Sequence, residues 1–257
     1  MNKELVSVIC PTHNSERYID ETIFCVLSQS YENLELIIVD DCSTDRTVEK
    51  VKKINDSRIK LIVNEKNSGA AFSRNVALRN ANGEYVAFLD GDDLWLPGKL
   101  EKQIQFMKEH KYMFTYTDYE LVDENGKRLK ILYTGPKRVT YRKFLRIDYI
   151  GTSTVIYKKE ICPLLQIPND IYKRNDDALW LTLSKFADCY RFPIVLSQYR
   201  RSGNSISSGS KAKLYKHHVI LYKKLYGFSS FRANLYAIRN VFYYILKQIK
   251  YRKKLKN

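Results

Sequence analysis

Three aspartates fall within four residues at Asp90-Gly91-Asp92-Asp93. Carboxylates held this close repel one another, and a bound cation relieves the repulsion. Gly91 permits a tight backbone path that aims neighbouring carboxylates at one point. Ligands that are all oxygen suit Mg²⁺ or Mn²⁺ shared with substrate phosphates. The cluster therefore predicts a divalent metal site, and its alternative is an acidic turn that caps a helix.

A second candidate group is Asp40, which directly follows the apolar run 36–39. A carboxylate at the end of a buried strand can accept hydrogen bonds from a nucleobase N–H or a ribose hydroxyl. The alternative is an aspartate that shapes the turn. For the neighbouring Asp41 we prefer a structural role, the capping of the next helix.

Two further groups lie at expected helix N-termini. Arg74 follows Gly69-Ala70-Ala71, where backbone N–H groups and a guanidinium suit a diphosphate or a base carbonyl, with a surface ion pair as the alternative. Asp176 and Asp177 open another helix, where a carboxylate could act as a general base or simply cap the helix. The residue types alone leave these roles open.

Four short apolar runs are expected to be strands that position these groups. They span 5–10, 34–39, 58–63 and 84–90, and Pro11 is expected to stop the first. Helical patterns lie between them at 15–29 and 70–80, and Ser43 is expected to cap another helix after the second strand. The alternation indicates right-handed crossovers and a parallel sheet, which binds ligands beyond the carboxyl ends of its strands. The polar clusters all fall at that edge.

The second half of the sequence is less regular. We expect two strands joined by a turn at Asn125-Gly126 within 112–129, and another strand at 152–159. A helix over 175–186, a strand over 192–200 and a flexible loop at 202–210 follow. From Lys211 onward the pattern is helical, basic and aromatic.

The net charge of +16 is unevenly distributed. Residues 201–257 contain fourteen Lys or Arg and no Asp or Glu, so the first two hundred residues are close to neutral. A basic tail on a neutral body indicates a polyanionic partner such as phospholipid, nucleic acid or a phosphorylated acceptor, or else a solvated charge run.

The location of the protein can also be predicted. Five scattered cysteines without CxxC spacing indicate a reducing compartment and no zinc site. The N-terminus lacks an apolar run long enough for a signal peptide, and no eighteen consecutive residues are apolar. We therefore expect a cytoplasmic protein that touches a membrane from one side at most.

Four segments resemble, in order and spacing, the nucleotide-binding half of family two glycosyltransferases of the GT-A fold: SVICPTHN, LELIIVDDCSTDRT, NSGAAFSRNVAL and GEYVAFLDGDDLW. Two later segments, RNDDALWLTLSK and SQYRRSGNSIS, are similar to the acceptor half of bacterial members that build surface polysaccharides. The resemblance implies an α/β, Rossmann-like, mostly parallel central sheet with helices on both faces. It divides a catalytic domain (1–210) into nucleotide-sugar-binding (1–100) and acceptor (101–210) halves, followed by a basic helical tail (211–257).

The resemblance also implies a donor pocket. Pro11, Thr12 and Asn14 would line the nucleoside site. Asp40 would contact the base, and Arg74 would help to hold the nucleotide. A UDP-sugar is the favoured donor.

The metal and the base follow from the same resemblance. Asp90, with Gly91 beside it, would lie near the ribose and the metal, and Asp92 would be the principal protein ligand of Mn²⁺ or Mg²⁺. Asp176 fits the place of the catalytic base. The residue before it departs from the Glu that the family often has, which leaves Asp176 and Asp177 as alternatives.

These parts imply an inverting, metal-dependent transfer of one sugar to a lipid-linked saccharide acceptor in surface polysaccharide synthesis. The metal would neutralise the departing diphosphate, and the base would take a proton from the acceptor hydroxyl as it attacks the opposite face of the anomeric carbon. The Gln-x-x-Arg-Trp motif and the transmembrane helices of processive members are absent. A single addition is therefore expected.

The tail contains a row of apolar residues at helical spacing. These are Leu235, Ile238, Phe242, Ile245, Leu246 and Ile249, and cations at 232, 239, 247, 250 and 252 occupy much of the remaining surface. A helix of this kind suits the interface of an anionic membrane. We expect peripheral attachment at the inner face of the cell membrane, and the alternative is that the row packs against its own domain.

Three other classes of protein are alternatives. A sugar-nucleotide nucleotidyltransferase needs an early Gly-rich basic loop, and a dinucleotide oxidoreductase needs GxGxxG after the first strand; the sequence has neither. A non-enzymatic RNA- or membrane-binding protein would account for the charge, but no RNA-binding module is recognisable. We expect no nucleic acid partner.

Overall fold

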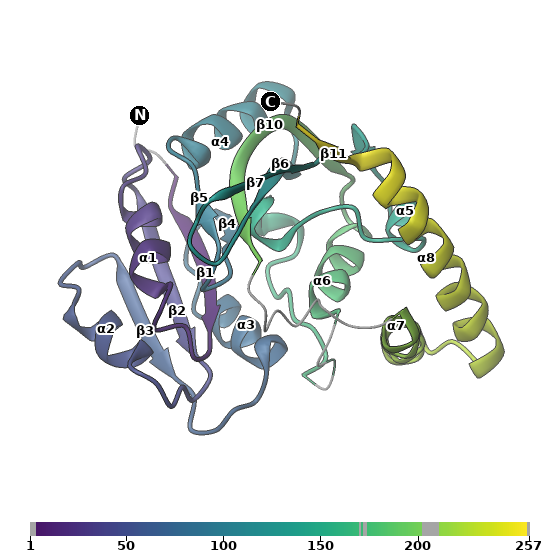
Figure 1. The fold of residues 1–257 in the computed structure, drawn as a ribbon, viewed down its shortest axis with the longest axis horizontal. Helices are drawn as coiled ribbons and strands as arrows, with labels where there is room; N and C mark the ends of the chain where they lie inside the picture. Colours follow the sequence, from purple (N-terminus) through teal and green to yellow (C-terminus); the bar gives the residue numbers. More distant parts are fainter. Residues whose placement is uncertain (1–3, 170, 172–173, 202–210, 256–257) are drawn as a thin grey trace.

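The structure is a computed structural model that describes residues 4–169, 171, 174–201 and 211–255. One mixed β-sheet runs through the molecule, with helices against both of its faces (Figure 1). The loop expected at 202–210 lies outside the described residues.

Four parallel strands form the N-terminal half of the sheet, in the order β4-β1-β2-β3. They are β1 (Val6–Thr12), β2 (Leu34–Asp40), β3 (Ile59–Val63) and β4 (Tyr85–Phe88). β1 and β4 are buried along their whole length, as nearly continuous apolar runs in a parallel sheet should be. The four predicted strands are confirmed.

The second half of the sheet continues from β4 with antiparallel strands in the order β9-β6-β7-β11. They are β9 (Val155–Lys158), β6 (Phe114–Val122), β7 (Arg128–Tyr133) and β11 (Arg252–Lys254). The long strand β10 (Cys189–Arg200) pairs in parallel with β6, and it also pairs with two short strands, β5 (Leu94–Trp95) and β8 (Arg138–Val139). The predicted strand pair within 112–129 is confirmed.

Helices from both halves of the chain cover the sheet. They are α1 (Ile19–Leu27), α2 (Thr47–Lys53), α3 (Ala70–Arg79), α4 (Lys99–His110), α5 (Tyr141–Phe144), α6 (Asn175–Leu183), α7 (Lys211–Tyr226) and α8 (Ser230–Tyr251), with short 3-10 turns at Thr152–Thr154 and Lys159–Ile161. Apolar residues of α1, α2 and α4 form one core, and those of α3, α6 and α7 form the other. Side chains alternate along β1, so Val8 and Cys10 enter the first core and Ile9 enters the second.

Pro11 does not stop β1, contrary to the prediction, because the strand continues to Thr12. β1 pairs with β4 only as far as Ile9 and Phe88. The missing N–H of Pro11 faces that side of the strand, so it leaves no ladder bond unmade.

The expected helix cap at Ser43 is also wrong. α2 begins only at Thr47, whose backbone N–H donates to the Asp45 carboxylate at 2.9 Å. Ser43 instead donates its N–H and hydroxyl to Asp40, at 2.8 and 2.5 Å. A short polar side chain after a strand can form hydrogen bonds within its own turn as readily as with a helix N-terminus. Ser43 forms them within its turn.

The basic tail returns to the body of the protein. α7 and α8 pack against each other, α8 runs along one side of the molecule in Figure 1, and β11 adds an edge strand to β7. β11 was not predicted, since a run of Lys and Arg carries no strand signal. Among the described residues, no helix combines the length and apolar character needed to cross a bilayer.

Candidate active site

The ends of β1, β2 and β4 meet at one edge of the sheet. Thr12 lies opposite Asp40 in the register of β1 and β2, and the Gly91 N–H donates to the Pro11 carbonyl at 3.3 Å. A Cβ on Gly91 would lie 2.7 Å from the Thr12 hydroxyl oxygen, so only glycine allows this approach. The fold thus brings four of the predicted nucleotide-site residues together.

Asn14 and Asp40 connect the two loops that follow β1 and β2. The Asn14 N–H donates to the Ser43 hydroxyl, and its side-chain oxygen accepts from the Thr44 N–H, each at 2.8 Å. Asn14 has a φ of 49°, a left-handed conformation that asparagine tolerates better than most residues. Asp40 is buried, with Ser43 bonded to both of its oxygens. The structure therefore gives both residues a role in shaping the loops, and their nucleotide contacts stay predictions.

Asp41 has the structural role that we preferred, but on a different helix. Its buried carboxylate accepts from the N–H groups of Ser68 and Gly69 at 2.9 and 2.6 Å, and from the Asn64 amide at 2.8 Å. It therefore fixes the loop that begins α3, and not the start of α2.

Within the acidic cluster at 90–93, the half-buried Asp92 carboxylate has no side-chain hydrogen-bond donor among the described residues. Burial, and next the repulsion of Asp90, raise its pKa to about 6. A divalent cation would offset both effects, and carboxylate oxygens suit Mn²⁺ or Mg²⁺. Asp90 and Asp92 therefore fit the implied metal.

The third aspartate of the cluster is structural. Asp93 is buried, and it accepts from the Ser153 hydroxyl at 2.5 Å and from the Arg200 N–H at 3.0 Å. The Arg200 guanidinium, also buried, donates to the Asp92 carbonyl at 2.9 Å and to Glu21 of α1 at 2.6 Å. Sequence analysis gave Arg200 no role. From β10, about a hundred residues away in the sequence, Arg200 holds the acidic loop (residues 90–93) in place. No local sequence pattern predicts such a contact.

Arg74 joins the two halves of the site. Its guanidinium donates to Oδ1 of Asp90, after β4, and to Oδ1 of Asn175, at the start of α6. Arg74 is only 6% exposed, so its ion pair is buried and the surface alternative is wrong. A nucleotide contact by Arg74 stays a prediction. What the structure shows is that the acidic loop and the start of α6 are adjacent.

The two candidate bases have different surroundings. Asp177 is buried and ion-paired with Arg174, with 2.6 Å between Oδ2 and Nε. Burial raises the pKa of Asp177 well above its usual range. Asp176 is half-buried, and its Oδ1 accepts only the Asp177 N–H among the hydrogen bonds of the described chain. Asp176 is therefore the carboxylate that an acceptor could reach.

Three more titratable residues surround this pair, and sequence analysis missed their place. Asp148 lies with Asp176 and Asp177 so that one oxygen of each falls within 4.8 Å of the others. The Lys247 ammonium donates to the Asp148 carbonyl at 2.8 Å, and His218 Nδ1 lies 4.0 Å from Asp177. They come from the loop after α5, from α8 and from α7, so only the tertiary fold reveals the cluster.

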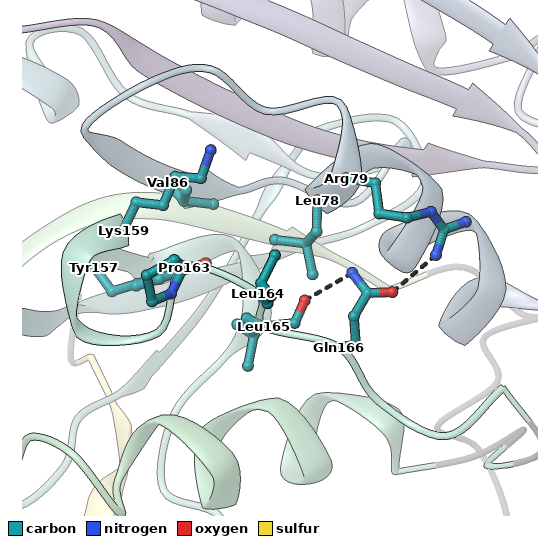
Figure 2. A pocket seen from close by; sticks show the side chains of 9 residues that line it. All are labelled: Leu78, Arg79, Val86, Tyr157, Lys159, Pro163, Leu164, Leu165 and Gln166. Atoms are coloured by element: carbon teal, nitrogen blue, oxygen red, sulfur yellow. Dashed lines mark hydrogen bonds between the residues drawn. The ribbon is translucent and has the colours of Figure 1, made fainter.

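A cavity of about 320 Å³ lies elsewhere, between α3 and the segment after β9 (Figure 2). Val86 of β4 and Lys159 line it, and the Gln166 amide there accepts from Arg79 at 2.8 Å. Val86 is near the start of β4, whereas Asp90 follows its end. The cavity is therefore separate from the acidic loop.

Comparisons with known proteins identify the family of this chain. The family model for glycosyl transferase family 2 matches residues 7–162, which include the acidic loop and every donor-side candidate. TuaG of Bacillus subtilis, a glycosyltransferase assigned to teichuronic acid biosynthesis, is 44% identical over 227 residues, covering 87% of this chain and 89% of TuaG. WfgD of Escherichia coli, a UDP-Glc:α-D-GlcNAc-diphosphoundecaprenol β-1,3-glucosyltransferase, is 38% identical over 223 residues, covering 86% and 87%.

Solved structures share the fold. TarS of S. aureus in complex with UDP superimposes with a TM-score of 0.69 at 24% identity, over 92% of this chain and 70% of the TarS fragment. A mannosyltransferase of Pyrobaculum calidifontis, solved with GDP-Man and Mn²⁺, gives 0.63 at 22% identity, over 92% and 69%. These similarities confirm the GT-A fold, and the matched family model and relatives confirm the wider prediction: this chain belongs to glycosyl transferase family 2.

Proposed function

We propose that this glycosyltransferase is inverting and metal-dependent, and that it adds one sugar from a UDP-sugar to a lipid-linked saccharide in surface polysaccharide synthesis. The observation that carries the proposal is the double hydrogen bond of Arg74. It places Asp90 of the acidic loop beside Asn175, the residue next to Asp176. A diphosphate held at the loop and an acceptor hydroxyl held at Asp176 would thus lie on neighbouring sides of one site.

The donor side would be built from the strand ends. Pro11, Thr12 and Asn14 would line the nucleoside, and the Asp40 turn would present oxygen acceptors to the base. Asp90 and Asp92 would hold Mn²⁺ or Mg²⁺, which supplies charge neutralisation for the departing diphosphate. Arg74 adds a buried positive charge beside Asp90.

Asp176, and not Asp177, would be the base on the acceptor side. Asp177 is already engaged by Arg174 and excluded from solvent. Asp176 has an oxygen available to take the proton of an acceptor hydroxyl as that oxygen attacks the anomeric carbon. No covalent intermediate is required, so one displacement inverts the configuration.

The relatives guide the choice of donor and acceptor. WfgD and the similar WfaP, both of Escherichia coli, are named for transfer from UDP-Glc to α-D-GlcNAc-diphosphoundecaprenol with β-1,3 linkage. A β-glucoside formed from an α-linked sugar nucleotide requires inversion. We therefore propose UDP-glucose as the first donor to test, and a diphosphate-linked lipid saccharide as the acceptor class.

The direct test uses purified protein, UDP-glucose, Mn²⁺ and a synthetic α-GlcNAc-diphosphate lipid, with UDP-GlcNAc and GDP-mannose as alternative donors. We expect transfer of a single hexose and a β-anomeric signal in the product by NMR. An α-linked product would contradict the inverting mechanism, and addition of many sugars would contradict single transfer.

We also propose that the protein works at the inner face of the cell membrane, through α8. Seven apolar side chains of this helix, between 42% and 81% exposed, form one continuous row: Phe231, Leu235, Ile238, Phe242, Ile245, Leu246 and Ile249. The alternative that the row packs against its own domain is wrong, since Ala233, Ala237 and Asn240 form the buried face. Exposed cations at 232, 250 and 252–254 flank the row, as anionic lipid would require.

Replacing Leu235, Ile238 and Phe242 together with Ser should release the protein from anionic vesicles. The parent should sediment with phosphatidylglycerol vesicles, and less so at high salt, because each nearby Lys or Arg adds about 1 kcal/mol on an anionic surface. The triple variant loses the apolar contact but keeps the cations, so its bound fraction should fall well below that of the parent, and high salt should remove what is left.

A matched control substitutes three apolar residues that are at least as exposed elsewhere in the protein, Phe24, Leu164 and Phe186. This control should still sediment with the vesicles. If the parent does not sediment with vesicles and the α8 variant instead changes the oligomeric state, the row is an interface between copies and the membrane proposal fails. Sedimentation unaltered by nuclease treatment would support the expected lack of a nucleic acid partner.

A further inference from the structure

A buried ionic cluster lies directly behind the proposed base. Asp148, Asp176 and Asp177 bring three carboxylates within 4.8 Å, and only Asp176 is partly exposed. Carboxylates this close destabilise one another unless positive charge lies among them. Arg174, paired with Asp177 at 2.6 Å, supplies one such charge from the same helix.

The second positive charge comes from the tail. Lys247 of α8 donates its ammonium hydrogen bond to the backbone carbonyl of Asp148 at 2.8 Å. Burial lowers the pKa of Lys247, while the charge of Asp148 opposes that change. An ammonium group is costly to enclose unless carboxylates lie nearby, and here they do.

The other basic groups around Asp176 are neutral or are bonded to partners other than Asp148. His218 of α7 is fully buried, and burial lowers its pKa well below the usual value, so it is neutral at physiological pH. Arg74 of α3 lies on the donor side, where it is bonded to Asp90 and Asn175. Arg174 is bonded to Asp177. Lys247 is thus the cation that serves the Asp148 side of the cluster.

We infer that Lys247 is a positioning residue for the transfer reaction: it fixes the Asp148 loop against the start of α6 and supplies positive charge to the carboxylate cluster that contains Asp176. The inference rests on the proposed role of Asp176 as the base. Helix α8 would then have two functions on two faces: the apolar row would bind lipid on one side, and Lys247 would support the carboxylate cluster on another.

The test compares Lys247→Met with Lys247→Arg and with Lys223→Met, a matched change at an exposed lysine of the neighbouring helix α7. Transfer from UDP-glucose to the synthetic lipid acceptor is measured across pH at saturating Mn²⁺. Without the charge of Lys247 the carboxylate cluster should bind protons more readily, so the acid limb of the kcat profile should move up by about one pH unit. On that limb kcat should fall about tenfold, while KM for UDP-glucose stays unchanged.

Lys247→Arg should restore the parental pH profile, and Lys223→Met should leave that profile unchanged. A folded Lys247→Met enzyme with the parental profile overturns the inference. If that variant does not fold, Asp148→Asn provides the second test: removing a negative charge should move the acid limb to lower pH, and no movement would again overturn it. Full activity of Asp176→Asn would instead show that the proposed base is wrong, whatever Lys247 does.

Discussion

Replacement of Asp92 by Asn is expected to abolish sugar transfer without unfolding the protein. No side chain of the described residues donates a hydrogen bond to the Asp92 carboxylate, so a neutral amide of the same shape should be accepted there. The amide is a poor metal ligand, and charge neutralisation by a metal contributes several kcal/mol to the transition state, so kcat/KM should fall by about three orders of magnitude or more. The measurement is transfer from UDP-glucose, together with a thermal melt.

Two controls accompany this variant. Asp20→Asn removes a carboxylate of α1 from its exposed ion pair with Lys50 of α2 and should leave activity within about twofold, because surface pairs contribute little. EDTA should inactivate the parent enzyme, and added Mn²⁺ should restore it. Full activity in EDTA would show that the acidic loop does not bind a catalytic metal.

The donor half could be predicted from the sequence because its signals are local. Each of the strands β1, β2 and β4 is a short apolar run that ends in polar residues, and parallel pairing brings those ends to one edge. Thr12, Asp40 and Gly91 meet there as expected. The predictions for Pro11 and Ser43 are wrong because the role of each residue depends on where the neighbouring strand or helix ends, which local preference does not determine.

The acceptor half could be predicted only in part, because its contacts join distant segments. The start of α6 is visible in the sequence, yet nothing local distinguishes Asp176 from Asp177; burial and the pairing with Arg174 do so. Arg200 supports the acidic loop from β10, and Lys247 reaches Asp148 across ninety-nine residues. Such contacts depend on tertiary packing, which periodicity and composition do not encode.

The tail shows how one pattern can carry two roles. Its apolar row was predicted from helical spacing, and the row is exposed. The sequence pattern groups Lys247 with the cations on the rest of the helix surface. In the structure its ammonium donates to the backbone carbonyl of Asp148, beside the carboxylate cluster. The same helix then continues into β11, which pairs with β7. Deleting the tail would therefore disturb the acceptor side, and single substitutions are the cleaner probe.

Replacement of Asp176 by Asn should lower kcat by about 10²–10⁴-fold, the usual contribution of a general base. The amide cannot take the proton of the acceptor hydroxyl. Donor binding should persist, because the donor-side candidates lie at the ends of β1, β2 and β4. The checks are steady-state transfer for kcat and calorimetric titration with UDP in the presence of Mn²⁺ for binding.

The matched control is Asp177→Asn, one residue further along α6. Asn has the shape of Asp177 and removes a charge that lies close to Asp148 and Asp176, so this variant should remain folded, as a thermal melt can check. The folded fraction of that variant should still transfer sugar at a rate within about tenfold of the parent, because the base is intact. If Asp177→Asn proves inactive while folded and Asp176→Asn does not, the two roles are exchanged. If both variants keep full activity, another group takes the proton of the acceptor hydroxyl, and the start of α6 has only a structural role.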